Sequence, residues 1–200
     1  MAALKNLLFL LAPVAMVMFP GSSSSAQTNA AAEVEVRTVK FSTVRQGGGG
    51  SGWLEATVEL AVRGGTGGGL YARFVDRVQV SLSLAVRKRT EGHEFFRSST
   101  ELVSLKTGRA AVRFYLPPEI LEREQVNTDP YAYLVDIAVR GRTVATAASP
   151  VLRSPDALQS FKDRVAQSAP GNDGILVPQY ESPFMMEHPG DTSSAIRKSR

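Results

Sequence analysis

The feature that most constrains this chain is a strict alternation of apolar with polar or small residues in three segments. It runs through Leu54–Val62 and Val78–Val86, and it returns in Tyr131–Val139 with Leu134 as one exception. Successive residues of a strand point to opposite faces of a sheet, so a period of two predicts strands with one buried face and one wet face. Antiparallel sheets have this character.

Shorter segments extend the prediction to seven strands. Phe95 and Phe96 fall on opposite faces of one of these segments, and we expect a β-bulge there. Seven half-buried strands without a long helix between them predict an immunoglobulin-like β-sandwich over residues 33–153, with a small β-barrel as the alternative architecture. Pro117–Arg123 predicts a single helical turn across the end of the sandwich. The four shorter strands are Val34–Phe41, Glu94–Leu105, Arg109–Leu116 and Thr143–Leu152.

A helix should follow the sandwich. Ser154–Asp156 supplies a capping serine, a proline suited to the first helical position and an acidic first turn. Leu158, Phe161 and Val165 then form a narrow apolar stripe. We predict a helix over residues 154–168 that packs back on the sandwich; contact of the stripe with another chain is the alternative.

Residues 169–200 are rich in proline, glycine, serine and aspartate, a composition that predicts a disordered tail. Two apolar islands interrupt it: Ile175–Val177, followed by Tyr180, and Phe184–Met186. Short apolar segments of this kind can dock on the sheet edge or groove of a partner.

The N-terminus has the three parts of a secretory signal peptide: Lys5, the apolar run Leu7–Phe19 and the small residues Ser24–Ala26. We expect cleavage after Ala26, which assigns residues 1–26 to the signal and 27–32 to a linker. The apolar run is shorter than the roughly 20 residues that a spanning helix needs, although an uncleaved anchor is the alternative. The expected location is extracytoplasmic, periplasmic or secreted, with no integral membrane segment after cleavage.

The composition limits the kinds of binding and catalytic site that this chain can have. The chain has no cysteine, so it can have neither a disulfide framework nor a thiolate metal site. Its net charge is only +4, and arginines are spread along predicted strands, so we expect no nucleic-acid partner. The two histidines, His93 and His188, lack metal-ligand spacing, no Gly-x-Ser-x-Gly motif is present, and we expect both imidazoles to be exposed.

Among the carboxylates, Glu55 and Glu59 are the candidates for a catalytic acid–base pair. Glu55 and Glu59 share one face of a strand but lie about 13 Å apart along it, too far for either glycosidase geometry. We expect Asp136 to pair with a nearby arginine and Asn172–Gly174 to be a plain turn rather than a calcium loop. Trp53 is predicted to be a buried anchor rather than a sugar platform. The sequence therefore predicts no catalytic, cofactor-binding or metal-ligating residue.

The strand count, Trp53 ahead of the second strand and the Tyr131–Val135 strand together resemble secreted bacterial immunoglobulin-like β-sandwich proteins. More loosely, they resemble the accessory proteins of type IV pilus-like machinery. The resemblance covers Val34 to Leu152.

An export signal combined with a β domain that lacks a catalytic motif favours a non-enzymatic interaction or structural module. We expect it to dock on a cell-envelope or surface-appendage complex, with other envelope or appendage proteins, or a second copy, as partners. The alternative is a carbohydrate-binding module, or a small hydrolase of unrecognised type. It would use aromatic residues among Trp53, Tyr71, Tyr115 and Tyr131.

Overall fold

The computed structural model describes residues 33–46, 51–64, 73–126, 129–188 and 196–197, the last pair as backbone only. The predicted signal peptide 1–26 and linker 27–32 lie outside the described residues. Within the described ranges, no helix has the length and apolar character required to cross a membrane.

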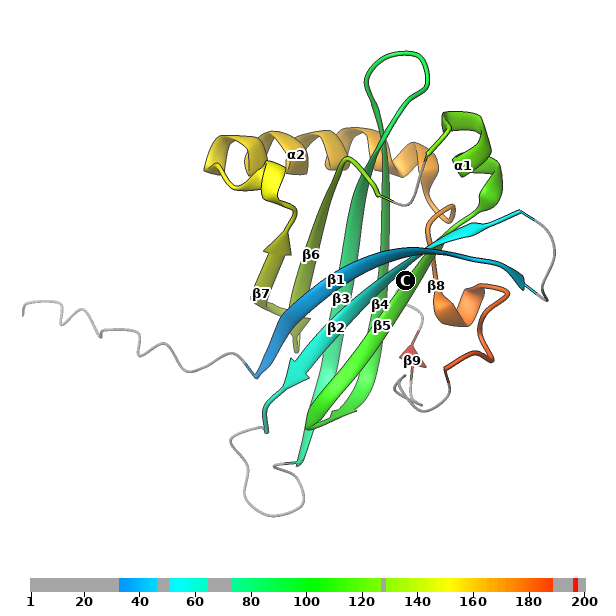
Figure 1. Ribbon diagram of the computed structural model, residues 1–200. Coiled ribbons are helices and arrows are strands. Elements are labelled where there is room, and N and C mark those ends of the chain that lie inside the picture. Colours follow the sequence, from blue (N-terminus) through cyan, green and yellow to red (C-terminus); the bar gives the residue numbers. More distant parts are fainter. Residues whose placement is uncertain (1–32, 47–50, 65–72, 127–128, 189–195, 198–200) are drawn as a thin grey trace, which may run out of the picture. The chain divides into compact units, whose positions relative to one another are not determined.

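The described strands form two antiparallel sheets (Figure 1). The first sheet has the order β1-β2-β5-β8 and the second has the order β7-β6-β3-β4-β9. Both sheets are open, so the strands that the structure describes make a sandwich and not the closed barrel considered as the alternative. The bounds in the first sheet are β1 Val34–Val44, β2 Trp53–Val62, β5 Gly108–Leu116 and β8 Val177–Pro178. Those in the second are β3 Phe74–Arg87, β4 His93–Lys106, β6 Ala132–Val139, β7 Arg142–Ala148 and β9 Ile196–Arg197.

Each of the seven predicted strands is found as one of β1 to β7. The segment predicted as Thr143–Leu152 ends early, at Ala148, because Pro150 has no N–H for a sheet and instead begins the short 3-10 helix η3, Pro150–Leu152. The β6–β7 hairpin turns at Arg140 and Gly141, whose φ angles of 51° and 80° are those of a tight type I′ turn.

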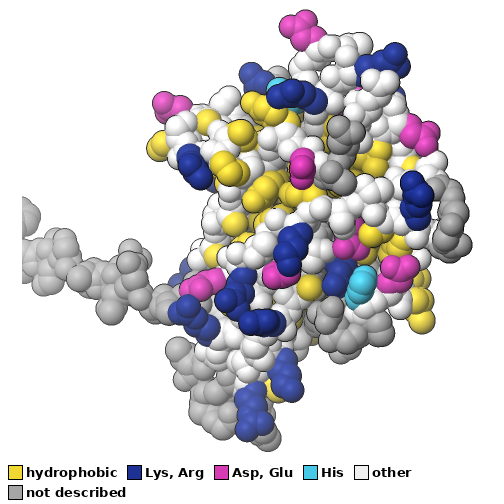
Figure 2. Space-filling model, in the orientation of Figure 1, with side chains coloured by type: hydrophobic (Ala, Val, Ile, Leu, Met, Phe, Trp, Pro, Cys, Tyr) yellow, Lys and Arg dark blue, Asp and Glu magenta, His cyan; other side chains and the backbone are white. Residues whose placement is uncertain are grey.

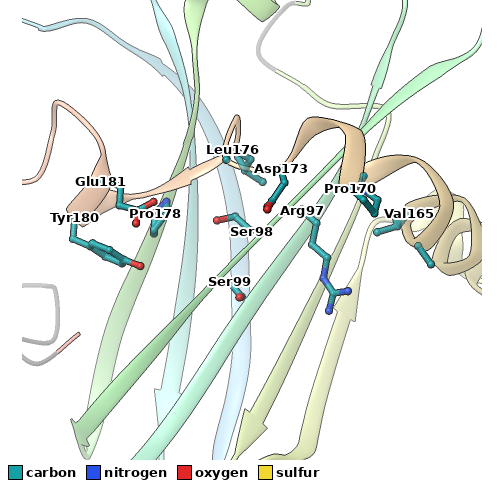
Figure 3. Close-up of a pocket in the computed structure, with 13 residues that line it drawn as sticks. Arg97, Ser98, Ser99, Val165, Pro170, Asp173, Leu176, Pro178, Tyr180 and Glu181 are labelled. Atoms are coloured by element: carbon teal, nitrogen blue, oxygen red, sulfur yellow. The ribbon is translucent and has the colours of Figure 1, made fainter. Parts of the chain in front are cut away.

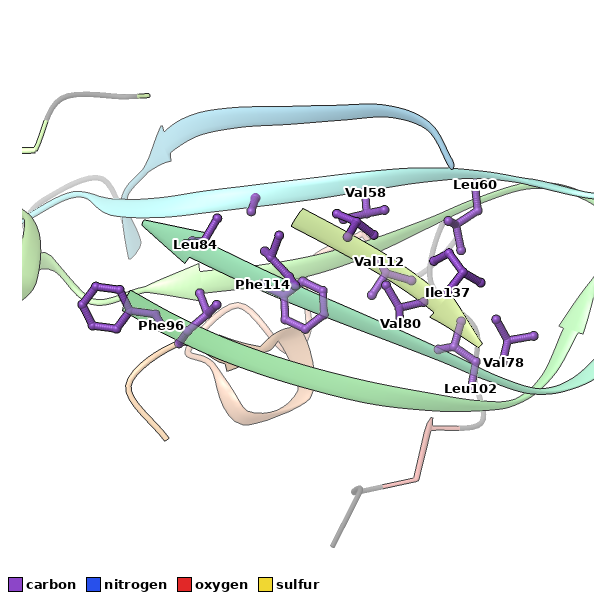
Figure 4. Close-up of a cluster of buried hydrophobic side chains, with 14 of the residues drawn as sticks. Val58, Leu60, Val78, Val80, Leu84, Phe96, Leu102, Val112, Phe114 and Ile137 are labelled. Carbon is purple, nitrogen blue, oxygen red and sulfur yellow. The ribbon is translucent and has the colours of Figure 1, made fainter. Parts of the chain in front are cut away.

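The core lies between the sheets (Figure 4) and contains the apolar positions that the alternation predicted for β2 and β3. Tyr131 is a correction: it was predicted to face inward, but it precedes β6 and is 43% exposed. The inward-facing residues of β2 are Leu54, Ala56, Val58, Leu60 and Val62, and those of β3 are Val78, Val80, Leu82, Leu84 and Val86.

The bulge predicted at Phe95 and Phe96 is wrong. The register between β3 and β4 shows no shift, with Ala85 opposite Phe95 and Leu84 opposite Phe96. Phe96 enters the core between the sheets, whereas Phe95 belongs to a second apolar cluster on the outer face of the second sheet. Both faces of β4 are therefore buried at this point.

Helix α2, Pro155–Ser168, covers that outer face as predicted. The Ser154 hydroxyl accepts a hydrogen bond from the Ala157 N–H at 3.2 Å and caps the first turn. Phe161 and Val165 are buried against Phe95 and its neighbours in the sheet. The cluster also contains Ala85, Ala132, Leu134, Leu152 and Ala169, so the helix explains why Leu134 departs from the alternation.

Helix α1, Pro118–Glu124, matches the turn predicted at Pro117–Arg123. Pro118 occupies the start of the helix, where a missing N–H costs nothing. Ile120 and Leu121 are buried in the core, so this short helix joins β5 to β6 while filling the space between the sheets.

The predicted disorder of residues 169–200 is wrong for residues 169–188, which pack on the sandwich. They form two short 3-10 helices, η4 (Ala169–Asn172) and η5 (Gln179–Glu181), with β8 between them. Leu176 is 2% exposed and Phe184 is fully buried. One residue of each apolar island, Leu176 and Phe184, is thus buried in the chain's own fold, whereas Met185 and Met186 are exposed. Residues 189–195 and 198–200 lie outside the described part.

Candidate functional site

A buried carboxylate lies on the outer face of the first sheet. Glu55 is 7% exposed, and its two oxygens accept hydrogen bonds from the Tyr115 hydroxyl at 2.9 Å and the Thr57 hydroxyl at 2.8 Å. The Arg113 Nε lies 3.9 Å from the Glu55 Oε1 atom. The strands bring these groups together, because Glu55 pairs with Tyr115 and Thr57 with Arg113 in the β2–β5 register.

The C-terminal segment seals this polar cluster. The Phe184 ring stacks on Tyr115 with centroids 4.7 Å apart and meets Trp53 edge-on at 5.9 Å. Burial raises the pKa of the Tyr115 phenol far above its usual value, and the hydrogen bond to Glu55 adds to the effect. The phenol therefore stays a hydrogen-bond donor, and Glu55 serves the packing of the sheet.

Replacing Tyr115 with phenylalanine tests that role. The variant keeps the stacked ring but leaves one Glu55 oxygen buried without its donor, so we expect a loss of about 1.5–3 kcal/mol in unfolding free energy. Urea denaturation measures it. Tyr131→Phe, at an exposed position, is the matched control and should change stability by less than about 0.5 kcal/mol. An equal effect of the two substitutions would contradict the assignment.

Glu59, the other carboxylate considered for catalysis, has a different environment. The Lys40 ammonium lies 2.6 Å from the Glu59 Oε1 atom, and this hydrogen bond holds the pKa of the carboxyl below its usual value. Glu55 is tied to Tyr115 and Thr57, so the two glutamates do not share a site. The two carboxylates therefore have different hydrogen-bond partners.

The histidines differ from each other. His188 is exposed, as predicted, but His93 is partly buried and its ring lies against Tyr131 with centroids 4.0 Å apart. Burial lowers the His93 pKa, and the positive charges of Arg87 and Arg164 lower it further. A hollow of about 220 Å³ adjoins this pair beside α2. Among the described residues, no cluster of histidine and acidic side chains could hold a metal ion.

Two further sequence predictions concern Asp136 and the Asn172–Gly174 segment. Asp136 was expected to pair with an arginine, but it accepts a hydrogen bond from the Thr146 hydroxyl of the neighbouring strand at 2.8 Å. Asn172–Gly174 is a turn, with Gly174 at a φ of 78°. The Asn172 side-chain amide donates to the Phe95 carbonyl at 3.0 Å, which ties this turn to β4.

The aromatic residues proposed for sugar binding do not form one platform. Tyr115 is buried, Trp53 is half-buried against Phe184, and Tyr131 is exposed beside His93. Tyr71 lies outside the described residues. The anchor predicted for Trp53 is only half-buried, because its cover comes from the C-terminal segment rather than from the core between the sheets.

A hollow of about 700 Å³ lies where β4 faces the C-terminal segment (Figure 3). Arg97, Ser98 and Ser99 line it from β4. Sequence reasoning missed this site. A signal was present, because residues 97–101 are polar at consecutive positions and interrupt the apolar pattern of the strand. The other wall includes Pro170, Asp173, Pro178, Tyr180 and Glu181.

Charges of both signs are interspersed on the face shown in Figure 2. Over the first sheet, Lys40 pairs with Glu59 and Arg63 with Glu35, the latter at 3.0 Å between the Arg63 Nη2 and the Glu35 Oε2 atoms. Lys40 and Arg63 on this sheet are therefore each paired with a carboxylate.

No protein-family model matches the chain, and no curated protein does. Among solved structures, a crystal structure from Akkermansia muciniphila is similar, with a TM-score of 0.65 and 14% sequence identity. The match covers 84% of this chain and 94% of that chain. A likeness at this identity shows the fold alone, so the chain is a mostly β protein of two packed antiparallel sheets, and its function must be argued from its surface.

Proposed function

We propose that this chain is a non-enzymatic, exported interaction module with an immunoglobulin-like β-sandwich. It docks on other proteins of a cell-envelope or surface-appendage complex of the pilus-like kind. The observation that carries the proposal is the hollow of about 700 Å³ that lies between β4 and the C-terminal segment. A strand edge next to a roomy groove is a recurrent way to bind an extended segment of another protein.

The hydrogen bonds and ion pairs of the candidate acid–base residues support a non-enzymatic role. Glu55 is sealed beneath Phe184 with both oxygens accepting hydrogen bonds, and Glu59 is ion-paired with Lys40. The His93 ring lies against Tyr131 at a tilt of 34°. A general acid or base must reach its substrate, and the enclosed position of Glu55 favours a structural task for that carboxylate.

A carbohydrate-binding function is the second candidate, and the exposure of Tyr131 is the observation in its favour. This ring is 43% exposed beside the hollow near His93, and the Arg87 guanidinium lies 5.5 Å from its centroid. A glycan array with the purified domain tests it: binding that disappears in Tyr131→Ala would support sugar recognition, and an empty array would remove it.

Crosslinking in living cells tests the docking function. The full chain, with an affinity tag after Arg200, is crosslinked in intact cells and the attached proteins are identified by mass spectrometry. We expect envelope or appendage proteins. A chain that lacks residues 1–26 is the control, because without the predicted signal it should stay inside and lose these partners. Recovery of an unattached monomer would overturn the proposal.

A further inference from the structure

The hollow of about 220 Å³ beside α2, called the α2 hollow below, has an apolar floor and an exposed apolar rim. Phe95 and Phe161 line it and are 7% and 5% exposed. Tyr131 and Val151 line it nearer the surface, where they are 43% and 50% exposed. Pockets that enclose a whole small-molecule ligand commonly measure about 300–1,000 Å³. The smaller volume of the α2 hollow suits one large side chain of a protein.

Two guanidinium groups give the α2 hollow a positive charge. Arg164 lines it, and the Arg87 guanidinium lies 5.5 Å from the centroid of the Tyr131 ring. Burial lowers the pKa of His93, another lining residue, and the charges of both arginines lower it further. None of the described residues that line the hollow is an aspartate or glutamate, and no described carboxylate forms an ion pair with Arg164. An occupant should therefore combine an apolar side chain with a negative charge.

The chain itself presents such a combination at residues 185–187, called the methionine turn below. Met185 is 58% exposed, Met186 is 81% exposed, and the next residue is the exposed Glu187. Single exposed apolar side chains are common on protein surfaces. Here two are adjacent, and Met186 is the most exposed large apolar side chain of the described part. The methionine turn thus offers an apolar side chain followed directly by a carboxylate.

The fold holds the methionine turn in place. Phe184, just before it, is fully buried. The Met185 N–H donates to the Ser182 carbonyl at 3.3 Å, and the Glu187 N–H donates to the Phe184 carbonyl at 3.0 Å. A group that is ordered before binding loses little conformational entropy when it binds. Methionine is also flexible enough to fill an irregular apolar space.

The α2 hollow and the methionine turn lie on different layers of the fold. Helix α2 covers the outer face of the second sheet, whereas Phe184 packs on Tyr115 of the first sheet (Figure 1). A contact between these two surfaces therefore joins different molecules. Since the two surfaces are unlike, each molecule still has one of them available, and the contact can repeat head to tail.

We propose that the α2 hollow binds the methionine turn of a second copy of this chain, with Met186 against the apolar floor and Glu187 facing Arg164. The inference goes beyond the docking function proposed above, because none of these residues lines the hollow of about 700 Å³ beside β4. One turn in one hollow belongs with the small, weak protein interfaces.

Analytical ultracentrifugation tests the inference on protein purified from cells that express the full chain. We expect the average mass to rise with concentration between about 10 µM and about 1 mM. Arg164→Glu sets two carboxylates against each other and should lower the association constant at least about tenfold, and Glu187→Arg should do the same with two guanidinium groups. Lys162→Glu makes the same charge change on another side of α2 and should lower it by less than about threefold.

A mixture of the two charge-reversed variants makes the test specific. In an equimolar mixture of Arg164→Glu and Glu187→Arg, every contact between unlike molecules places opposite charges together. The mixture should therefore associate at least about fivefold more strongly than either variant alone. Recovery on mixing would also show that both variants are folded. A mixture as weak as its components would overturn the pairing of Glu187 with Arg164.

Met186→Ala tests the apolar part of the contact without changing any charge. It should lower the association constant about tenfold, as expected for the side chain that fills the hollow. Val103→Ala, at a residue that is 40% exposed on β4, is the matched control and should lower it by less than about threefold. Association that ignores Met186→Ala would overturn the site. A wild-type chain that stays monomeric at about 1 mM would overturn the inference and leave the docking function, which crosslinking to envelope proteins tests, unaffected.

Discussion

Replacing Phe184 with alanine is expected to lower the free energy of unfolding by about 3–5 kcal/mol, the usual cost of truncating a buried phenylalanine. Phe184 is fully buried and contacts both Tyr115 and Trp53. Its loss leaves a cavity over the first sheet and removes the cover from the only tryptophan of the chain. Denaturant unfolding measures the stability, and the fluorescence of Trp53 should shift to longer wavelength as its ring gains contact with water.

Met186 offers the matched control two residues away, since it is 81% exposed. Met186→Ala should change stability by less than about 0.5 kcal/mol and leave the emission of Trp53 unchanged. If Phe184→Ala behaved like the control, the packing of residues 177–187 on the first sheet would be refuted, and the disorder predicted from composition would be restored.

The second large effect is expected at Phe161. This residue of α2 is 5% exposed and meets Phe95 edge-on at 5.9 Å between ring centroids. Phe161→Ala should cost about 3–5 kcal/mol in global stability or, if α2 detaches first, in the stability of the helix alone. Amide hydrogen exchange distinguishes the two, because detachment speeds exchange in residues 155–168 while β3 stays protected.

Lys162 is the neighbour to compare, because it is exposed on the same helix. Lys162→Ala preserves helix propensity and should leave exchange in α2 within a factor of about two. A helix whose exchange did not respond to Phe161→Ala would not be held by the outer apolar cluster.

The alternation of residues predicted the strands and their inner face well, because burial between two sheets acts on every second position. It could not predict what covers the outer face. Ala85, Phe95 and Leu134 are apolar at outward positions because α2 lies over them, and the helix is far away in sequence. Helix α2, and not a local bulge, explains why Phe95 is apolar at an outward position.

The polar cluster was missed for a related reason. Glu55 occupies an outward position that the pattern assigns to water, yet it is 7% exposed, and Phe184 stacks on its partner Tyr115. Composition suggested disorder for the segment that contains Phe184, since it averages many polar residues with a few apolar ones. The average hides the two large apolar side chains of this segment that are buried, Leu176 and Phe184.

The cover over Trp53 and Tyr115 also sets an order of events during synthesis. Translation completes β1, β2 and β5 long before the ribosome reaches Phe184, and domains begin to fold from their N-terminal side. Until Phe184 is seated, the Trp53 and Tyr115 rings on the first sheet lack this cover. A product released before Phe184 would keep that face uncovered and be prone to aggregate, so concealment of this surface distinguishes finished molecules from incomplete ones.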